Sequence, residues 1–225
     1  MATIQVNNLV ARAGTIAQDQ TGIRWPTAEW IDWLNDAQRE VVLVKPQASV
    51  KNASVILTAG STKQALPTDG IQLIDVSRNM GVAGSTAGNA IRVVSREVLD
   101  AQIPTWHSDA NATGSIKHYA FDSRDPKNYY VYPKAPATAW YVEVIYSANP
   151  TDCTAGGTIQ IDDIYANALL NLMLFRAYSK DAEYAQNGQL AQAYYAAAMN
   201  SLGVKTQVEG GQNPNNVLAN PNIVK

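Results

Sequence analysis

The stretch IDDIYANALLNLMLFRAYSK, residues 161–180, decides the fold of this 225-residue chain. Its apolar side chains recur at the helical spacing of three and four residues, at Ile164, Tyr165, Ala168, Leu169, Leu172 and Phe175. Leu170, Met173 and Leu174 make the remaining sides of the same helix apolar as well. Because a helix that is apolar nearly all round is buried on more than one side, we expect this one at the centre of a helical core.

Three further long helices are predicted around this central one. A single apolar stripe runs from Val6 to Ala17, so the first helix ends near Gln18. The second begins at Thr27, a plausible N-cap, and ends before Pro46. The last helix covers residues 189–202, and Gly203 is expected to end it.

Between residues 49 and 150 the apolar pattern changes to a period of two, which is typical of strands. The predicted strands are 54–58, 72–82, 91–94, 117–122, 128–132 and 139–147, with a short helix over 96–101. Five or six such strands predict a small sandwich or barrel.

Together these patterns predict an α+β protein. Two N-terminal helices (residues 1–48) and two C-terminal helices (155–206) should form a four-helix bundle. A small antiparallel β-sandwich or barrel (49–154) would be inserted into that bundle. Residues 207–225 have no periodicity and are rich in Asn, so they predict an extended C-terminal arm.

The charge content is low and nearly balanced. Asp, Glu, Lys and Arg make up 16% of the chain, where about 25% is typical, and the net charge is −2. The 18 Asn and 14 Gln supply much of the polar surface instead. This balance argues against a protein that grips nucleic acid through its phosphates. The low charge also indicates that part of the surface is shared with other subunits.

Targeting and redox signals are sparse as well. The N-terminal sequence has no secretion signal, and the longest apolar run is too short to span a bilayer, so a membrane protein is not expected. The single cysteine, Cys153, excludes an internal disulfide framework and fits a reducing compartment.

Residues that could carry chemistry do not form a recognisable motif. The two histidines, His107 and His118, lie outside any metal-binding spacing, so a structural role is the better interpretation of each. The same holds for Cys153, which has no neighbouring histidine. The glycine-bearing stretch GVAGSTAGN, residues 81–89, lacks the spacing of a phosphate-binding loop and is better interpreted as a hairpin tip.

One alternative remains open in the β-rich segment. Glu143 lies in a strand with aromatic neighbours and could act as an acid in a sugar-binding cleft, although a solvent-facing strand residue is the commoner case. The aromatic residues are Tyr129, Tyr130, Tyr132, Trp140, Tyr141 and Tyr146. They could stack on sugars, but cross-strand packing is their commoner use.

Two segments resemble the head-to-tail adaptors of tailed bacteriophages. The first contains Trp33-Leu34-Asn35-Asp36-Ala37-Gln38-Arg39-Glu40, within residues 24–46. The second contains Arg176-Ala177-Tyr178-Ser179-Lys180-Asp181-Ala182-Glu183-Tyr184-Ala185, within residues 161–203. The order of two helices, a β insertion and two helices also matches that family, although the β-rich segment carries no matching motif.

The resemblance implies a structural virion protein without catalysis or cofactor. It implies a homo-oligomeric ring of about a dozen subunits beneath the portal protein, to which the tail tube or nozzle protein docks. Double-stranded DNA would pass through the lumen without specific contacts. The protein would be assembled in the host cytoplasm and located in the virion neck between head and tail.

Three sets of residues are expected to make the contacts of such a ring. The arm that binds the portal is assigned Asn213, Asn216, Val217, Leu218, Ile223 and Val224. The subunit interface is assigned Leu170, Met173, Leu174, Tyr194 and Tyr195. Loops facing the tail are assigned Val82, Ser85 and Trp106. The alternative function is a tail-associated protein whose β-module binds or depolymerises carbohydrate.

Overall fold

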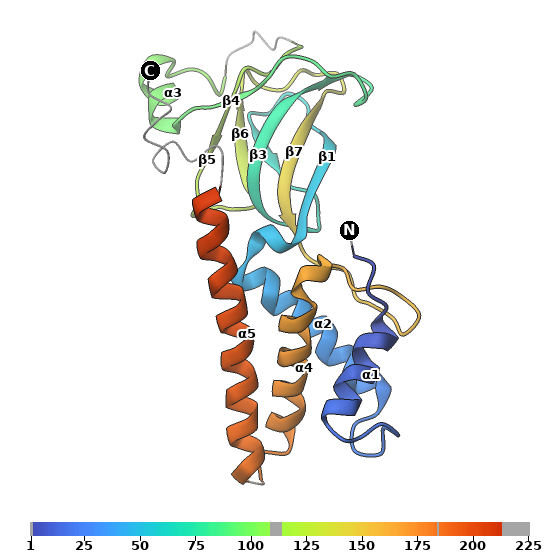
Figure 1. Ribbon diagram of the computed structural model, residues 1–225. Helices are drawn as coiled ribbons and strands as arrows, with labels where there is room; N and C mark the ends of the chain where they lie inside the picture. Colours follow the sequence, from blue (N-terminus) through green and yellow to red (C-terminus); the bar gives the residue numbers. More distant parts are fainter. Residues whose placement is uncertain (1, 109–113, 184, 213–225) are drawn as a thin grey trace. The chain divides into compact units, whose positions relative to one another are not determined.

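The computed structural model describes residues 2–108, 114–183 and 185–212 (Figure 1). The chain divides into two compact units. One unit is helical and combines Met1–Ala48 with Pro150–Lys225, whereas the other is the β-rich segment Ser49–Asn149. The helical unit is therefore discontinuous in sequence.

The helical unit contains four long helices. They are α1 (Val6–Ile16), α2 (Thr27–Val44), α4 (Ala166–Lys180) and α5 (Ala185–Gln212). A 3-10 turn, η2 (Asp163–Tyr165), leads into α4, and another, η1 (Pro46–Ser49), follows α2. α2 begins at Thr27 itself with Pro26 as its N-cap residue, so the expected Thr27 cap is displaced by one position.

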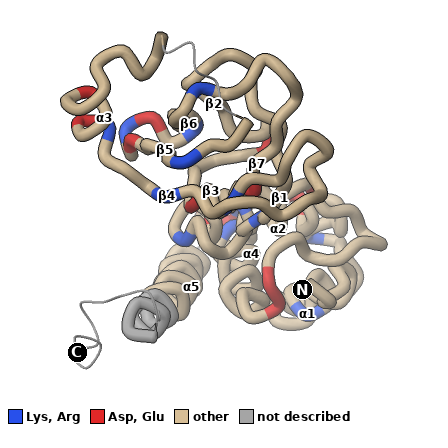
Figure 2. Tube along the Cα trace, turned by 90° about the horizontal axis from the view of Figure 1, so that it is seen from above, with Lys and Arg blue, Asp and Glu red and all other residues tan. Residues whose placement is uncertain are grey.

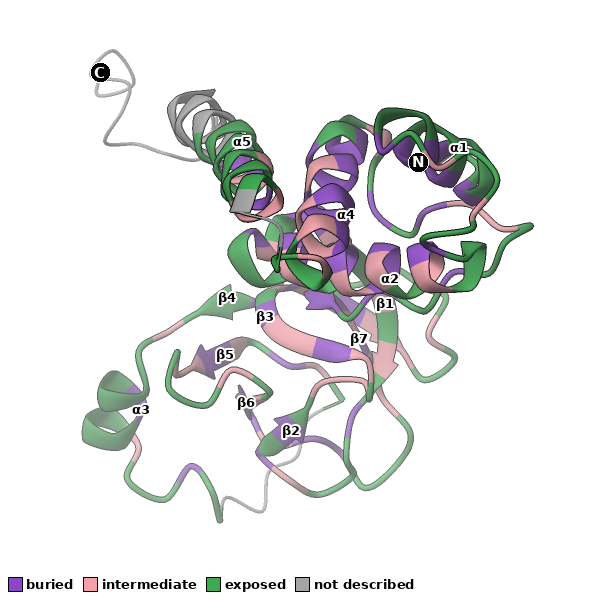
Figure 3. Ribbon diagram, turned by 90° about the horizontal axis from the view of Figure 1, so that it is seen from below, coloured by how far each residue is buried: buried purple, intermediate pink, exposed green. Residues whose placement is uncertain are grey.

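These helices do not form the predicted four-helix bundle, and that part of the fold prediction is wrong. α4 lies at the centre and contacts α1, α2 and α5, with α5 on one side and α1 on the other (Figures 1 and 3). The helices differ too much in length to share one bundle core, since α1 has 11 residues and α5 has 28. Because α4 is apolar nearly all round, the others pack around it instead. The α+β class itself is consistent with the structure, since the described residues form five α-helices and two sheets.

The last helix is longer than its sequence predicts. α5 runs through Gly203 and ends at Gln212. A glycine inside a helix costs about 1 kcal/mol relative to alanine, which weakens a helix without having to end it. The first residues of the expected arm, 207–212, are therefore helical, and residues 213–225 lie outside the described residues.

The β-rich unit is built from two sheets. One has the strand order β1-β7-β3 and is antiparallel, and the other has the order β2-β6-β5-β4. The strands of the first are β1 (Val50–Ile56), β3 (Gly70–Gly81) and β7 (Tyr141–Ala148). Those of the second are β2 (Lys63–Ala65), β4 (Arg92–Val93), β5 (His118–Phe121) and β6 (Asn128–Tyr132). The central strand β7 pairs with both of its neighbours through most of its length.

The second sheet is mixed, in contrast to the antiparallel module that was expected. β4 pairs with β5 in parallel, whereas β5 and β2 pair with β6 antiparallel. The physical reason is the connection between β4 and β5, which contains the helix α3 (Arg96–Gln102). A parallel pair needs such a crossover connection, since a tight hairpin can only join antiparallel strands.

The two sheets share one apolar core. Val142, Val144 and Tyr146 alternate along β7 and are buried together with Tyr129 and Val131 of β6. A second cluster joins Leu99 of α3, Trp106 and Ala120.

Asn79, at the end of β3, is a polar centre within the β-rich unit. Its amide nitrogen donates to the carbonyl oxygens of Asn89 (2.9 Å) and Ile116 (2.8 Å). Its amide oxygen accepts from the Ile116 N–H (2.8 Å) and from the Trp140 indole (2.9 Å). All four hydrogen-bonding positions of one buried side chain are thus used to hold the loops around the sheet edge.

No helix in the described part of the chain combines the length and the apolar character needed to cross a membrane.

Candidate functional site

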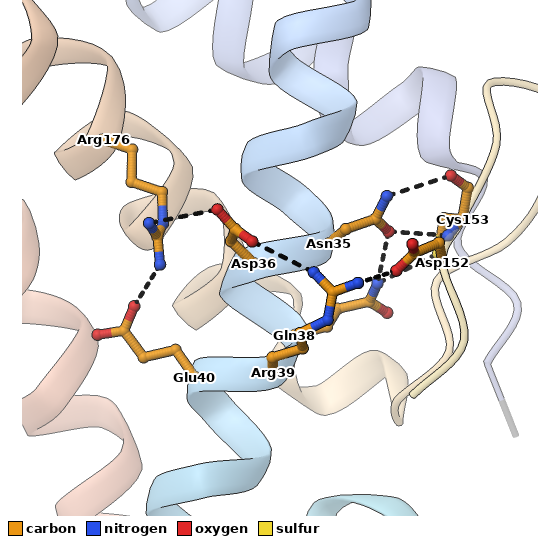
Figure 4. Close-up of polar contacts among 8 residues, drawn as sticks. All are labelled: Asn35, Asp36, Gln38, Arg39, Glu40, Asp152, Cys153 and Arg176. Carbon is orange, nitrogen blue, oxygen red and sulfur yellow. Dashed lines mark hydrogen bonds and ion pairs between the residues drawn. The ribbon is translucent and has the colours of Figure 1, made fainter. Parts of the chain in front are cut away.

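The polar residues of the Trp33–Glu40 segment point from α2 toward two different partners (Figure 4). Asn35 and Gln38 are three residues apart and therefore share one side of the helix. They face the segment around Cys153. Asp36 and Glu40 are four residues apart on another side and face Arg176 of α4. α2 thus connects two parts of the helical unit that follow the β-rich segment in sequence.

Asn35 binds the backbone of Cys153 in the way that a neighbouring strand would. Its amide oxygen accepts from the Cys153 N–H (2.8 Å), and its amide nitrogen donates to the Cys153 carbonyl oxygen (3.3 Å). The side chain is buried, so both backbone groups obtain a partner where water has little access. A single amide therefore fixes the returning chain against α2.

Gln38 continues this contact one turn further along α2. Its amide oxygen accepts from the Gln160 N–H (2.6 Å), and its amide nitrogen lies 3.2 Å from the Cys153 Sγ. Burial raises the pKa of the Cys153 thiol, and the Sγ lies 3.3 Å from the Thr158 carbonyl oxygen, to which it donates. The thiol is therefore held in its protonated form, which is the poorer nucleophile. This environment supports the structural interpretation of the cysteine.

Ion pairs extend the same region across to α4. Arg176 contacts Glu40 (3.0 Å) and Asp36 (3.5 Å), and Asp36 also contacts Arg39 (3.2 Å). Arg39 in turn pairs with Asp152. Asp36 lies between the guanidinium groups of Arg39 and Arg176. Their positive charges offset the repulsion between the carboxylates of Asp36 and Glu40.

The other ends of the two segments are joined as well. Lys180 at the end of α4 pairs with Glu29 in the first turn of α2, and Arg24 pairs with Asp181 at 2.5 Å. The two stretches that carry the resemblance to phage adaptors are more than 100 residues apart in sequence and lie side by side in the structure. Their polar residues bind each other and have a structural role.

An aromatic cluster also connects α2 with α4, and it extends to α5. Trp25 makes edge-to-face contacts with Trp30 (ring centroids 5.7 Å apart) and Tyr178 (5.8 Å). Trp30 contacts Trp33 at 5.1 Å, and Tyr178 stacks on Tyr194 of α5 at 5.7 Å. These rings link α2, α4 and α5 through geometry that aromatic pairs favour.

The residues expected at a subunit interface have different environments. Leu170, Met173 and Leu174 are buried by the chain itself, which accounts for the apolar circumference of α4 without a second subunit. Tyr194 is half-buried in its stack with Tyr178. Tyr195 is exposed and contacts Phe175.

The residues expected in tail-side loops also differ. Val82 and Ser85 are exposed in the segment that follows β3. Trp106 is fully buried in the α3 cluster, where its indole donates to Asp100 (2.8 Å) and its ring stacks on His107. The residues assigned to the portal arm, Asn213, Asn216, Val217, Leu218, Ile223 and Val224, lie outside the described residues.

Two of the side chains considered for chemistry are engaged in structural contacts. Glu143 pairs with Arg78 at 2.8 Å, and the Trp140 indole donates to Asn79. Within residues 2–108, 114–183 and 185–212, no three His, Cys, Asp or Glu side chains gather closely enough to hold a metal ion.

Asp19 is a structural residue that the sequence reasoning missed. Its carboxylate accepts backbone N–H groups from Ile23 (3.0 Å), Arg24 (3.0 Å) and Trp25 (2.8 Å), which fixes the connection between α1 and α2. The signal was present, because an aspartate directly before a glycine-bearing turn commonly binds the backbone a few residues on.

The comparison with known families identifies the chain. No curated protein matches the sequence. A family described as SU10 adaptor protein matches residues 4–218, which is nearly the whole chain and includes both segments joined through α2 and α4. This confirms the resemblance to phage head-to-tail adaptors, and the chain belongs to the SU10 adaptor protein family.

Proposed function

We propose that this phage adaptor forms a ring of about twelve copies beneath the portal protein and joins the head to the tail tube or nozzle protein. The observation that carries the proposal is the family match over residues 4–218. Membership of an adaptor family implies a structural role in the virion neck and association with other virion components. The ring, its stoichiometry and the individual partners are the proposed part.

The helical unit has the properties that a ring element needs. Ion pairs and an aromatic cluster join α2, α4 and α5, and buried amides fix the returning chain to α2, so this part of the unit can act as a rigid body. Closed rings require each subunit to present a fixed geometry to the next. A unit joined in this way supports repeated, identical contacts.

We assign portal binding to the C-terminal residues 213–225. This segment contains the apolar residues Val217, Leu218, Ile223 and Val224 among asparagines. Such a segment can bury its apolar side chains on a partner, while its amides form hydrogen bonds without the cost of desolvating ions. The end of α5 at Gln212 defines where the segment begins.

Contacts with the tail are assigned to the exposed loop residues Val82 and Ser85. Trp106 would act indirectly there, since it is buried and holds the loop that follows α3. The lumen is assigned to double-stranded DNA. A chain with a net charge of −2 would not hold DNA by phosphate neutralisation, so the genome could pass.

The proposal is tested by mixing the purified protein with its portal protein and imaging the complex by electron cryomicroscopy. A ring on the tail-facing side of the portal supports the adaptor function. A protein that stays monomeric and unattached contradicts it. Binding to polysaccharide that is lost in Trp140→Ala or Glu143→Gln would support the carbohydrate alternative instead.

The role of the C-terminal segment has its own test. Truncation after Gln212 removes residues 213–225 and leaves α5 intact, so we expect a folded protein that no longer joins the portal. A matched variant keeps the full length and replaces Val217, Leu218, Ile223 and Val224 with serine. Portal binding of wild-type affinity by both variants would refute the assignment.

A further inference from the structure

α5 exposes a long surface that carries no charge. Residues Ala185–Gly203 contain no Asp, Glu, Lys or Arg, so this part of the helix is tan in Figure 2. The side turned away from α4 is nevertheless exposed (Figure 3), and Leu190 is 42% exposed. The solvent-facing side of a helix normally carries charged residues. We call this surface, which consists of Leu190, Ala193, Ala197 and Asn200, the α5 face.

The α5 face is held in place by its own unit. Ala191, Ala198 and Leu202 of the same helix are buried, and Tyr194 stacks on Tyr178 of α4. The exposed residues are therefore presented by an anchored helix. Its small side chains at Ala193 and Ala197 let another element approach the backbone closely.

A hollow whose lining is almost free of charge, like the α5 face, lies on the α1 side of the same unit. It has a volume of about 470 Å³ and is lined by α1, the α1–α2 connection and the start of α2, including Ala11, Thr15 and Thr27. Asp19 is the one charged residue among its described lining residues, and its carboxylate already accepts three backbone N–H groups. Ile23, next to the lining residue Gly22, is 86% exposed.

The two surfaces face in different directions. α4 separates α5 from α1 within the unit (Figures 1 and 3). A contact between two different surfaces of identical subunits is heterologous, and it generates a ring when the rotation between neighbours closes. A contact between two copies of one surface would stop at a dimer.

We propose that the α5 face of one copy docks into the α1 hollow of the next copy. This inference rests on the proposed ring and identifies the surfaces that build it. The two surfaces suit each other because neither brings a charge into the contact that would need a partner after losing water. Burying Leu190 and Ile23 together removes apolar surface that each copy exposes alone.

The contact is tested by introducing opposite charges on its two sides. Ala193→Lys places a charge on the α5 face, and Ala11→Glu places one in the hollow. Both positions are exposed in the single chain, so the folds should remain intact, which circular dichroism checks. The readout is the fraction of protein in rings, measured by native mass spectrometry and by imaging with and without portal protein.

Each single variant should lower the ring fraction at least tenfold, and the double variant should restore it, since the two charges then face each other across the contact. Rings of normal yield in both single variants would overturn this contact and leave the adaptor function intact. Failure of the double variant to recover would show that the two surfaces are not partners. Absence of self-association in the wild-type protein under both conditions would overturn the ring itself.

Cross-linking distinguishes a neighbouring copy from the chain's own C-terminal segment as the occupant. A Leu190→Cys, Thr15→Cys double variant treated with a short bismaleimide should give a ladder of multimers. Each single-cysteine variant is the control, and Cys153 is buried. If Leu190→Cys instead cross-links within one chain to Val217→Cys, the C-terminal segment covers the α5 face and the proposed contact is wrong.

Discussion

α4 and α5 are neighbouring helices of one unit, yet their surfaces have different explanations. Met173 and Leu174 of α4 are buried by α1, α2 and α5, so the apolar circumference of this helix is satisfied within one chain. α5 lacks charge over Ala185–Gly203 but keeps one side exposed. The apolar sides of α4 are covered within the chain, whereas the exposed side of α5 is covered only in the proposed contact with a second copy. The difference separates the residues that stabilise the subunit from those that can join subunits.

The largest effect is expected from a charge at the centre of α4. Met173→Asp places an unpaired carboxylate at a position with 0% exposure, which should cost at least about 4 kcal/mol of the free energy of unfolding. Urea denaturation followed by circular dichroism measures this. Met173→Leu is the matched control, since a volume-conserving change costs less than about 1.5 kcal/mol. A stable Met173→Asp protein would mean that α4 is not the core of the unit.

A smaller effect is expected where α2 binds the returning chain. Gln38→Leu removes the acceptor for the Gln160 N–H, so the free energy of unfolding should fall by about 2 kcal/mol. The loosened segment should also speed alkylation of Cys153 by iodoacetamide at neutral pH, where the raised pKa keeps the native thiol protonated. Gln47→Leu, at an exposed position, is the control. Unchanged stability together with unchanged alkylation would argue against this contact.

The ion pairs between α2 and α4 should contribute less. Arg176→Met removes the contacts to Asp36 and Glu40 and should cost about 1 kcal/mol, because the arginine side chain is only partly exposed. The comparison variant is Arg124→Met, whose side chain is 89% exposed and whose loss should therefore lower the free energy of unfolding less than Arg176→Met does. Equal effects in denaturant titrations would show that the pairs of Arg176 act as ordinary surface pairs. A double-mutant cycle with Glu40→Gln isolates the coupling.

The smallest effect on stability is expected on α5. Ala193→Asp should change the free energy of unfolding of the monomer by about 0.7 kcal/mol or less, the difference in helix propensity between the two residues. Thermal unfolding at protein concentrations where the chain is monomeric checks this. A loss comparable to that of Met173→Asp would mean that the exposed side of α5 is part of the subunit core, which would remove the distinction between the two helices.

Periodicity predicted the regular elements well where neighbouring residues determine them. The stripe in residues 6–17 corresponds to α1, and residues 128–132 form β6 as expected. β2 was missed because it has three residues, too few for a pattern. Gly203 was wrongly expected to end the last helix, because a glycine weakens a helix without having to end it. The arrangement of the helices depends on contacts between distant residues, so lengths and stripes alone wrongly predicted a bundle.

The site was only partly predictable for a related reason. The segment Trp33–Glu40 was recognised from its residues, but the partners of Asn35 and Gln38 lie more than 100 positions away, at Cys153 and Gln160. Neither of these carries a local signal for that contact. Asn79 shows the same limit in the β-rich unit, where one amide binds segments that only the fold brings together.

The division of the helical unit has a consequence for the order of folding during synthesis. α2 ends at Val44 and α4 begins at Ala166, so the ribosome must produce the whole of Ser49–Asn149 before α2 can meet its main partner. At about 5–20 residues per second this takes several seconds or more. The β-rich unit is continuous in sequence and can fold in that interval. We therefore expect α1 and α2 to gain protection from proteolysis later than the β-rich unit, although they are synthesised first.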